Sequence, residues 1–359
     1  MKDYLGYIAA KFLSFIFCLL PLRFSLFLGR GIGVLAFFIN KKRRVVAYTN
    51  LKAAFCKEKG PAELRGLVKK VYQNLGQVLI EVLRFPVINS RYIQKFISIK
   101  GLKRLKEIMA QNKGIIILTG HFGNWELSSL IGGFLGFPIS VLAREQKHTQ
   151  LNELLNSYRQ MAGCKVIKKG LSTRQLIKAL QSGEIVGILA DQDAGKLGIF
   201  VNFFGRPTST HSGAFIFARK TGALILPTFI VREKGPYHRI DLLEPIKLKN
   251  NQDSDVDIYS AIQEFSNVLE SYVRRYPSQW LWVHKRWKST PQRPILILND
   301  GKPGHLNQSI AVANIIQKYR QDKGTSVENT PYRIVDVRYK NNFLKTLLKI
   351  CSNFSSSNC

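Results

Sequence analysis

The sequence predicts an α/β fold in which a mixed central sheet is flanked by helices and preceded by a hydrophobic N-terminal membrane anchor. From residue 114 onward, short β-branched runs alternate with segments of helical periodicity, which favours a sheet covered by helices on both faces. Two of the predicted strands run directly into polar loops, where α/β proteins place catalytic residues. With 359 residues, 45% of them apolar, the chain can form one large domain or two.

Residues 1–40 predict the anchor. Positions 4–39 are apolar except for three basic side chains, and Pro21 divides them. Neither half is an uninterrupted run of about 20 apolar residues, so a spanning helix and a pair of shorter interfacial segments fit equally well. A secretory signal is disfavoured because Lys11 interrupts the apolar core and no small-residue cleavage site follows. The basic residues 41–44 come next, and the positive-inside rule predicts that they keep the rest of the chain cytoplasmic.

The overall composition narrows the class of partner. The chain carries 54 Lys and Arg against 23 Asp and Glu, a formal net charge of +31, which indicates a polyanionic partner. Because the sequence has no zinc-finger spacing, RNP motif or long basic helix, we expect a membrane surface and no nucleic acid. Five cysteines are scattered without a Cys-x-x-Cys pair, which predicts a reducing compartment and no structural metal.

The remaining elements follow from hydrophobic periodicity. Residues 62–85 carry apolar side chains at helical spacing and predict a long helix. Residues 114–119 are apolar, β-branched and bounded by glycines, which is typical of a buried strand. Further strands are expected at 138–142, 164–167, 185–190, 223–231 and 238–246, and further helices at 125–132, 150–162, 172–181 and 257–275.

The hexapeptide from His121 to Glu126 carries the strongest functional signal. It follows the strand at 114–119 and reads His-Phe-Gly-Asn-Trp-Glu. Asn124 is the predicted N-cap of the next helix, so Glu126 falls in the first turn, where unpaired N–H groups favour an anion. On a continuous helix two side chains five residues apart would point about 140° away from each other, so they meet only if the chain bends between them, as Gly123 allows.

A histidine held by a carboxylate beyond a strand end is a general base with a fixed tautomer. The hexapeptide contains no serine or cysteine nucleophile, which favours direct transfer: His121 takes a proton from a substrate hydroxyl as that oxygen attacks an activated acyl group. The alternative is a helix-capping carboxylate beside a buried histidine.

Two further segments supply candidate binding residues. The polar loop at 190–196 and the aromatic stretch at 200–207 suit a ligand with an anionic head and an apolar tail, although the aspartates could instead be turn formers and Arg206 a solvated charge. In the helix at 150–162, Arg159 lies at the edge of the apolar face and could point toward the end of the sheet, and Arg144 follows a predicted strand.

Together, the hexapeptide, the Asp-Gln-Asp-Ala-Gly loop with its Phe-Phe-Gly-Arg-Pro continuation, and the block Trp280 to Trp287 resemble the lipid A biosynthesis (lauroyl/myristoyl) acyltransferases of the lysophospholipid acyltransferase superfamily. The resemblance extends from the anchor to about Pro291. It implies a glycerolipid acyltransferase-like fold with a His-x4-Glu acyltransferase domain at residues 41–292.

The resemblance implies an inner-membrane enzyme, with its catalytic domain on the cytoplasmic face, that moves a fatty acyl chain from an acyl carrier thioester to a hydroxyl of an anionic lipid A precursor or related glycolipid. The donor would be acyl-ACP, bringing acyl carrier protein as a partner, or acyl-CoA, and no metal or redox cofactor is required. His121 would be the base and Glu126 its orienting partner. The implied substrate-binding residues are Asn124, Arg144, Arg159, Asp191, Gln192 and Arg206. Alternatives are a lysophospholipid or mannolipid acyltransferase, or a non-catalytic basic protein of the membrane surface.

Residues 293–359 depart from this family. Residues 295–309 predict a strand, a glycine-rich turn and the start of a helix, and they resemble the opening of the mitochondrial-fission ELM-like family, whose fold resembles glycosyltransferases. About 65 residues follow Pro294, which is short for a nucleotide-sugar domain of ordinary size. We therefore expect a partial domain and assign it no activity.

Overall fold

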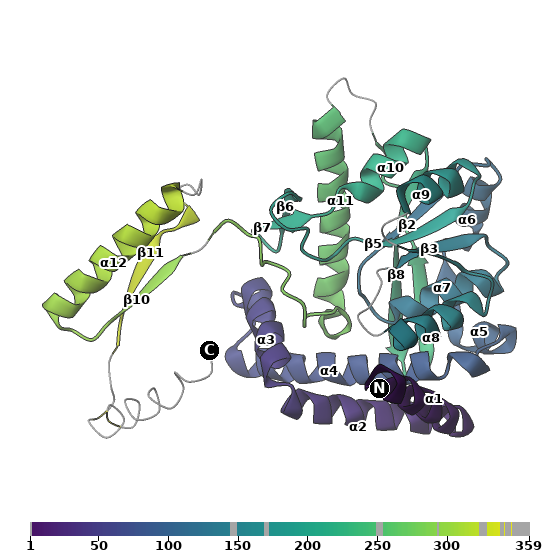
Figure 1. Cartoon of the computed structure of the whole chain (residues 1–359), viewed down its shortest axis with the longest axis horizontal. Helices are drawn as coiled ribbons and strands as arrows, with labels where there is room; N and C mark the ends of the chain where they lie inside the picture. The colour runs from purple at the N-terminus through teal and green to yellow at the C-terminus, as the bar shows by residue number, and fades with distance from the viewer. Residues whose placement is uncertain are drawn as a thin grey trace. The chain divides into compact units, whose positions relative to one another are not determined.

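The structure is a computed structural model that describes residues 2–143, 149–168, 172–248, 254–292, 294–322 and 329–337, together with residues 341 and 346. The chain forms two compact units, Met1–Ser289 and Thr290–Cys359 (Figure 1). The predicted boundary after residue 292 lies close to this division.

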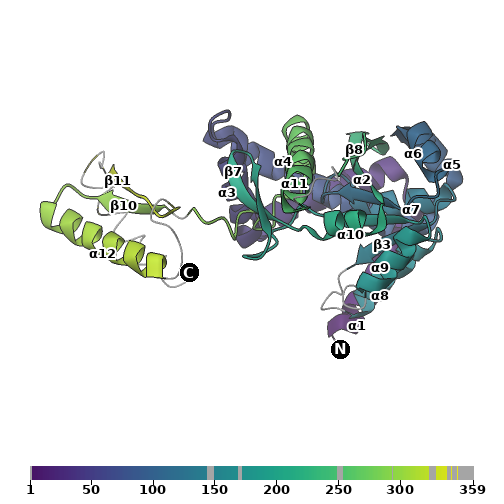
Figure 2. The ribbon, with the colours of Figure 1, turned by 90° about the horizontal axis from the view of Figure 1, so that it is seen from above.

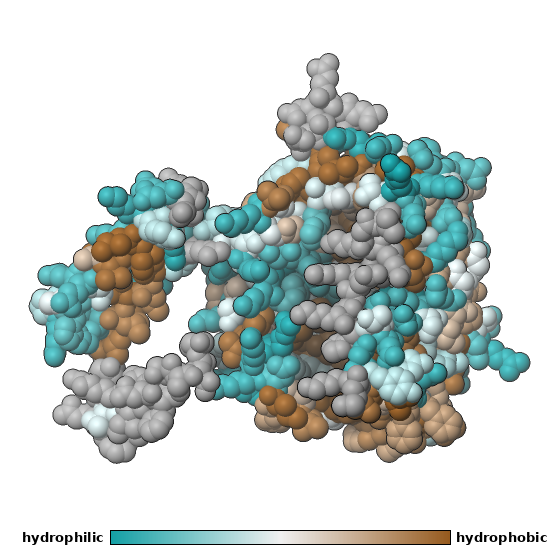
Figure 3. Space-filling view, viewed as in Figure 1, coloured by the Kyte–Doolittle hydropathy of each residue, from teal (hydrophilic) through white to brown (hydrophobic). Residues whose placement is uncertain are grey.

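The N-terminal apolar stretch forms two helices, α1 (Lys2–Leu19) and α2 (Leu22–Ile39), which divide at Pro21, the second of the two arrangements that the sequence left open. Within the described part of the chain, α2 is the one helix long and apolar enough to cross a membrane. Hydrophobic side chains gather along the lower edge of the larger unit in Figure 3, where Figure 1 places α1 and α2. The large apolar side chains exposed on these two helices include Phe12, Phe15, Leu19, Phe24, Phe27, Leu35, Phe38 and Ile39.

Glycines allow α2 to lie directly against α4 (Pro61–Leu83). A Cβ atom on Gly33 would lie 2.2 Å from the backbone oxygen of Tyr72, and one on Gly76 would lie 2.1 Å from the backbone oxygen of Gly29. Small residues at a helix interface permit this close approach of two backbones. Helix α4 also confirms the long helix that the sequence predicts at residues 62–85.

The basic segment after the anchor is helical, which the sequence did not predict. It forms the first turn of α3 (Lys41–Phe55), because the side chain of Asn40 caps the helix by accepting a hydrogen bond from the backbone N–H of Arg43 (3.1 Å).

The larger unit is built on a seven-stranded sheet of order β1-β9-β8-β2-β5-β3-β4. All neighbouring strands are parallel except β8 and β9, so the predicted mixed sheet is confirmed. The strands are β1 (Ile97–Lys100), β2 (Ile115–Thr119), β3 (Ile139–Ala143), β4 (Lys165–Lys168), β5 (Ile185–Leu189), β8 (Leu224–Lys234) and β9 (Tyr237–Leu242).

Helices cover both faces of this sheet (Figures 1 and 2). They are α5 (Ser90–Phe96), α6 (Leu102–Met109), α7 (Trp125–Phe134), α8 (Thr149–Gln160), α9 (Ser172–Gln181), α10 (Gly213–Thr221) and α11 (Ser254–Arg275), with short 3₁₀ turns at Phe85–Val87 and Pro277–Gln279. The predicted helices at 125–132, 150–162, 172–181 and 257–275 are confirmed within a few residues, whereas α5, α6 and α10 were not predicted.

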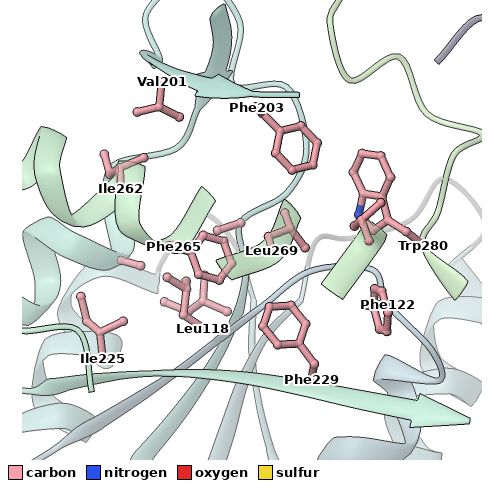
Figure 4. Packing of buried hydrophobic residues seen from close by; sticks show 14 of the residues in the cluster. Leu118, Phe122, Val201, Phe203, Ile225, Phe229, Ile262, Phe265, Leu269 and Trp280 are labelled. Atoms are coloured by element: carbon pink, nitrogen blue, oxygen red, sulfur yellow. The ribbon is translucent and has the colours of Figure 1, made fainter. Parts of the chain in front are cut away.

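Side chains of β2 alternate between two hydrophobic clusters, as the two-residue period of a strand requires. Ile116 and Leu118 belong to the cluster that includes Phe229 and Trp280, and Ile115 belongs to the cluster on the other face. Figure 4 shows Phe122, Phe229 and Trp280 gathered above the sheet, with the Phe122 and Phe229 rings 5.8 Å apart edge to face. Strand β2, which leads to the hexapeptide, is therefore packed against hydrophobic side chains on both faces of the sheet.

The aromatic stretch at 200–207, read from the sequence as a loop continuation, is an antiparallel hairpin of β6 (Ile199–Phe203) and β7 (Arg206–Thr210). Its two-residue turn, Phe204-Gly205, has φ angles of 54° and 69°. Positive φ at both turn positions matches the twist of a tight hairpin.

The smaller unit contains β10 (Ile295–Asn299), α12 (Pro303–Asp322) and β11 (Tyr332–Asp336). The two strands pair in parallel across the helical connection. The predicted strand, glycine turn and helix start at 295–309 are confirmed, with Gly301 at φ 86° in the turn.

Candidate active site

Strand order brings His121 and Asp191 together. β2 and β5 are parallel neighbours, and their last residues, Thr119 and Leu189, are register partners. His121 and Asp191 each lie two positions beyond those partners, at the same edge of the sheet. The Nδ1 atom of His121 lies 2.7 Å from Oδ1 of Asp191, and the backbone N–H of His121 donates to Oδ2 at 2.8 Å.

Asp191 is fully buried and accepts a third hydrogen bond, from Nε1 of Trp280 (2.8 Å). Burial would raise the pKa of Asp191, but the charge of His121 and its hydrogen bonds outweigh burial and hold that pKa well below its usual range. A carboxylate that accepts from Nδ1–H leaves Nε2 of His121 as the basic nitrogen. That atom lies 3.4 Å from the amide nitrogen of Gln192.

The pKa of His121 lies above its ordinary value. Burial of the ring lowers it, but the charge and hydrogen bond of Asp191, together with the charge of Glu126, raise it by more. His121 is therefore a strengthened base.

The carboxylate hydrogen-bonded to His121 is thus Asp191 rather than the predicted Glu126. Glu126 forms a bidentate ion pair with Arg159, with Nε to Oε2 at 2.8 Å and Nη2 to Oε1 at 2.7 Å. The bend at Gly123 exists, with φ 58°, but Glu126 on the first turn of α7 lies against α8 instead of turning back to His121. A catalytic role for Glu126 stays a prediction.

Asn124 is the N-cap of α7, as predicted, with its side-chain oxygen accepting from the N–H of Leu127 (3.2 Å). Its amide nitrogen donates to the buried carboxylate of Glu81 (2.8 Å), and the residue has no exposed surface. Both polar groups of its side chain thus bind inside the protein, and the predicted substrate contact of Asn124 stays a prediction. Glu81 in turn pairs with the buried Arg232 of β8.

Residues 279–281 hold the hexapeptide from the other side. Gly123 N–H donates to the carbonyl of Gln279 (2.9 Å), and Leu281 N–H donates to the carbonyl of His121 (3.0 Å). A Cβ atom at position 123 would lie 1.9 Å from the carbonyl oxygen of Ile230, so only glycine fits there. The hexapeptide loop is consequently rigid.

Arg286 is a site residue that the sequence reasoning missed. It is fully buried and donates to the carbonyls of Gln192 (3.1 Å) and Ser209 (2.6 Å) and to Oγ1 of Thr210 (2.9 Å). Burial lowers its pKa to about 10. Arg286 thereby ties the Asp191–Gln192 loop to β7. The sequence analysis singled out the segment 280–287 through its family resemblance, but it did not single out Arg286 within that segment.

Arg206 does not join the site. Arg206 is exposed on β7 and donates to the carbonyl of Ala53 in α3 (3.3 Å), and it has no contact with His121 or Asp191 among the described residues. Arg144 lies outside the described residues.

An apolar cavity opens beside His121, between α7 and the sheet. Its empty volume is about 950 Å³, open solvent at its mouth included. Glu126 and Arg159 are the charged residues that line it, and the ring of Trp125 separates it from His121 at 5.1 Å between ring centroids. Its apolar lining includes Ile99, Leu102, Ile117, Ile131, Leu135, Phe137, Ile139, Val141, Ile185 and Leu242.

Metal ligation is not indicated by the described residues, since they contain no group of three or more His, Cys, Asp or Glu side chains arranged to hold an ion. The expectation that no cofactor is needed stays a prediction.

Comparison with known proteins agrees with the resemblance drawn from the sequence blocks. Residues 1–289 match the family model of bacterial lipid A biosynthesis acyltransferases. The chain is 28% identical over 275 residues to the lipid A biosynthesis palmitoleoyltransferase of Escherichia coli K12, covering 76% of this chain and 87% of that protein. It is 27% identical over 269 residues to the lauroyltransferase of the same organism, covering 74% and 85%. It is also 26% identical over 221 residues to the phosphatidylinositol mannoside acyltransferase of Mycobacterium tuberculosis, covering 60% and 68%. The chain therefore belongs to the bacterial lipid A biosynthesis acyltransferase family and is an enzyme that transfers acyl groups.

Proposed function

We propose that this chain is a membrane-associated O-acyltransferase that moves a fatty acyl chain from an acyl carrier thioester to a hydroxyl of a lipid A precursor or related glycolipid. The observation that carries the proposal is His121, whose Nδ1 is held by the buried Asp191 and whose ring contacts Trp125 in the wall of an apolar cavity. The non-catalytic alternative is set aside because the family consists of acyltransferases.

The reaction follows from this arrangement. Nε2 of His121 takes the proton of the acceptor hydroxyl while the acceptor oxygen attacks the thioester carbonyl carbon. The carbon–sulfur bond then breaks, and the departing thiolate takes the proton back from His121. Asp191 stabilises the imidazolium ring formed between these steps, because its carboxylate already accepts from Nδ1.

The apolar side chains that line the cavity suit the acyl chain of the donor. Each buried CH₂ group gains about 0.8 kcal/mol, so a long chain among side chains such as Ile131, Leu135 and Ile139 is held firmly. The position of Glu126 and Arg159 at this cavity supports a role in placing the thioester end of the donor.

The start of α7 suits the oxyanion of the tetrahedral intermediate. The first N–H groups of a helix have no intrahelical partners, and those of Trp125 and Glu126 begin α7 directly after the His121 loop. The helix dipole favours negative charge at this end. We assign the oxyanion to this helix start.

The surroundings suit a membrane and an acidic donor. The exposed apolar side chains of α1 and α2 would lie in the lipid, and residues 41–44 would hold the enzyme to the anionic cytoplasmic surface. The net charge of +31 suits an anionic donor, and acyl carrier protein and acyl-CoA are both anionic.

A second acceptor class, mannosylated lipid, is favoured by the similarity to phosphatidylinositol mannoside acyltransferases. Purified enzyme is assayed with acyl-ACP and three acceptors: a Kdo-linked lipid A precursor, a phosphatidylinositol mannoside and a lysophospholipid. His121→Ala is run beside it. Transfer to the lipid A precursor that disappears in the variant supports the first proposal. Transfer to either other lipid reassigns the acceptor, and the absence of His121-dependent transfer to all three rejects the proposed reaction.

A further inference from the structure

A groove runs between α2 and α4 and ends beside His121; its residues do not line the acyl cavity. We call it the α2–α4 groove. It is lined by Ile32, Gly33, Ala36, Asn40, Arg43, Tyr72, Leu75, Gly76, Leu79, Gln192, Leu281, Val283 and His284. The glycines that bring α2 and α4 into contact form part of its wall.

The groove is apolar along the helices and polar at its inner end. Ile32, Ala36, Leu75 and Leu79 supply the apolar walls, and Ile32 and Leu79 are 39% and 49% exposed. Ile32 and Ala36 are on α2, which is long and apolar enough to cross a membrane and carries further exposed apolar side chains. A lipid acyl chain is the ligand that such a wall accommodates.

The inner end carries groups that suit a polar head. The exposed guanidinium of Arg43 is held by one hydrogen bond to the carbonyl of Val283 (3.0 Å), which aims a cation along the groove. His284 contacts the carbonyl of Leu281 through Nδ1, so Nε2 carries a lone pair. That Nε2 atom is buried and has no hydrogen-bond partner among the described residues. It could therefore accept a hydrogen bond from a ligand group such as a sugar hydroxyl.

The groove and the acyl cavity each have one lining residue in contact with the His121 ring. Gln192 lines the groove and lies 3.4 Å from Nε2 of His121, whereas Trp125 lines the cavity and stacks edge to face on the same ring. The two hollows share no lining residue. A hydroxyl held beside Gln192 would therefore lie next to Nε2 of His121, and a thioester carbon brought past Trp125 to the same nitrogen would be open to attack by that oxygen.

We propose that the α2–α4 groove binds the acceptor lipid, so that the acceptor reaches His121 from the membrane along α2 while the donor chain occupies the separate acyl cavity. The proposal rests on the proposed acyl transfer. One acceptor chain lies along Ile32 and Leu79, an anionic group of the head meets Arg43, and the reacting hydroxyl lies at Gln192 and His284.

The test fills the groove without touching the acyl cavity. Ile32→Trp and Leu79→Trp add bulk to opposite walls, and Phe27→Trp is the matched control, because Phe27 is on α2, is 68% exposed and does not line the groove. Arg43→Glu reverses the charge at the inner end, and Lys52→Glu is its control on the exposed surface of α3. Full-length enzyme in detergent micelles is assayed with acyl-ACP and the Kdo-linked precursor.

We expect each groove variant to raise the acceptor KM by about tenfold or more, since the added bulk or reversed charge opposes the acceptor alone. In Ile32→Trp and Leu79→Trp the donor KM and any hydrolysis of acyl-ACP without acceptor should stay at wild-type values, and both controls should match wild type. Unchanged acceptor KM in all three groove variants, or an equal rise in the controls, overturns the groove assignment.

A photoactivatable probe gives an independent measurement. The precursor carrying a diazirine in one acyl chain should crosslink to peptides containing Ile32 or Leu79 in the wild type, and Ile32→Trp should reduce this labelling. Labelling confined to the acyl cavity, around Ile131 and Leu135, overturns the assignment. If wild-type enzyme shows no His121-dependent hydrolysis or transfer while the probe still labels the groove, the reaction assignment fails and the lipid site stands.

Discussion

Nδ1 of His121 lies 2.7 Å from Oδ1 of Asp191, although the two residues are 70 positions apart in the sequence. Their strands, β2 and β5, are neighbours in the sheet, and both residues follow the strand ends directly. His121 and the carboxylate that holds it thus come from two loops, and the hexapeptide supplies only the histidine.

Replacing His121 with alanine should lower turnover by about 10² to 10⁴, the usual contribution of a general base. Acyl transfer from acyl-ACP measures the loss, and thermal unfolding checks that the fold persists. His121→Gln keeps a polar side chain of similar size and should be equally inactive. A variant that retains full turnover would remove His121 from the mechanism.

Asp191→Asn should lower the plateau activity by up to about 10⁴, the loss seen when such a carboxylate becomes an amide. The amide oxygen would stay with the donors from Trp280 and the His121 backbone, and the amide nitrogen would face Nδ1. Nδ1 must then accept, so the proton moves to Nε2 and blocks the base. Single-turnover rates at saturating donor measure this loss.

In Asp191→Asn, the acidic limb of the pH profile of kcat/KM should move to lower pH. Only the neutral ring accepts a proton, and the carboxylates raise the pKa of His121 above 6.5, so wild-type activity falls as pH drops through a midpoint above that value. Without the Asp191 charge, burial lowers this pKa and the acidic limb moves to lower pH. An acidic limb that moves to higher pH, or stays in place, would contradict the assignment of the base.

Glu126→Ala and Arg159→Ala should each reduce activity, and the double variant should lose less than the sum of the two effects. The residues form a bidentate pair at the cavity mouth, so removing one leaves the other misplaced. Residues in one ion pair typically couple by about 0.5–3 kcal/mol. Activation free energies from kcat/KM complete the cycle, and strict additivity would show that the pair does not act as a unit.

Glu81→Ala should destabilise the protein by about 3–5 kcal/mol, because it leaves the buried Arg232 without its carboxylate. It also removes the acceptor of the Asn124 amide beneath the hexapeptide. Glu233→Ala is the matched control: Glu233 pairs with Arg239 but is 45% exposed, and such pairs contribute about 0–1 kcal/mol. Urea unfolding in detergent compares the two, and equal losses would contradict the distinction.

Sequence alone determined the features that depend on local chemistry. Pro21 cannot continue the preceding helix, so the division of α1 from α2 was readable. Asn124 has the side chain that caps a helix, and short apolar, β-branched runs marked the strands whose ends carry His121 and Asp191. The three family blocks added the reaction class, confirmed by the match over residues 1–289.

Only the tertiary structure decided which groups meet. The sequence placed Glu126 near His121, but contact depends on the order of β2 and β5 and on the direction of α7 toward α8, so Asp191 holds His121 and Arg159 holds Glu126. The burial of Arg286 against β7 and the groove beside α2 likewise arise from segments far apart in the chain. Periodicity and capping act over a few residues, whereas strand order and helix packing are set by the burial of the whole core, which no local pattern encodes.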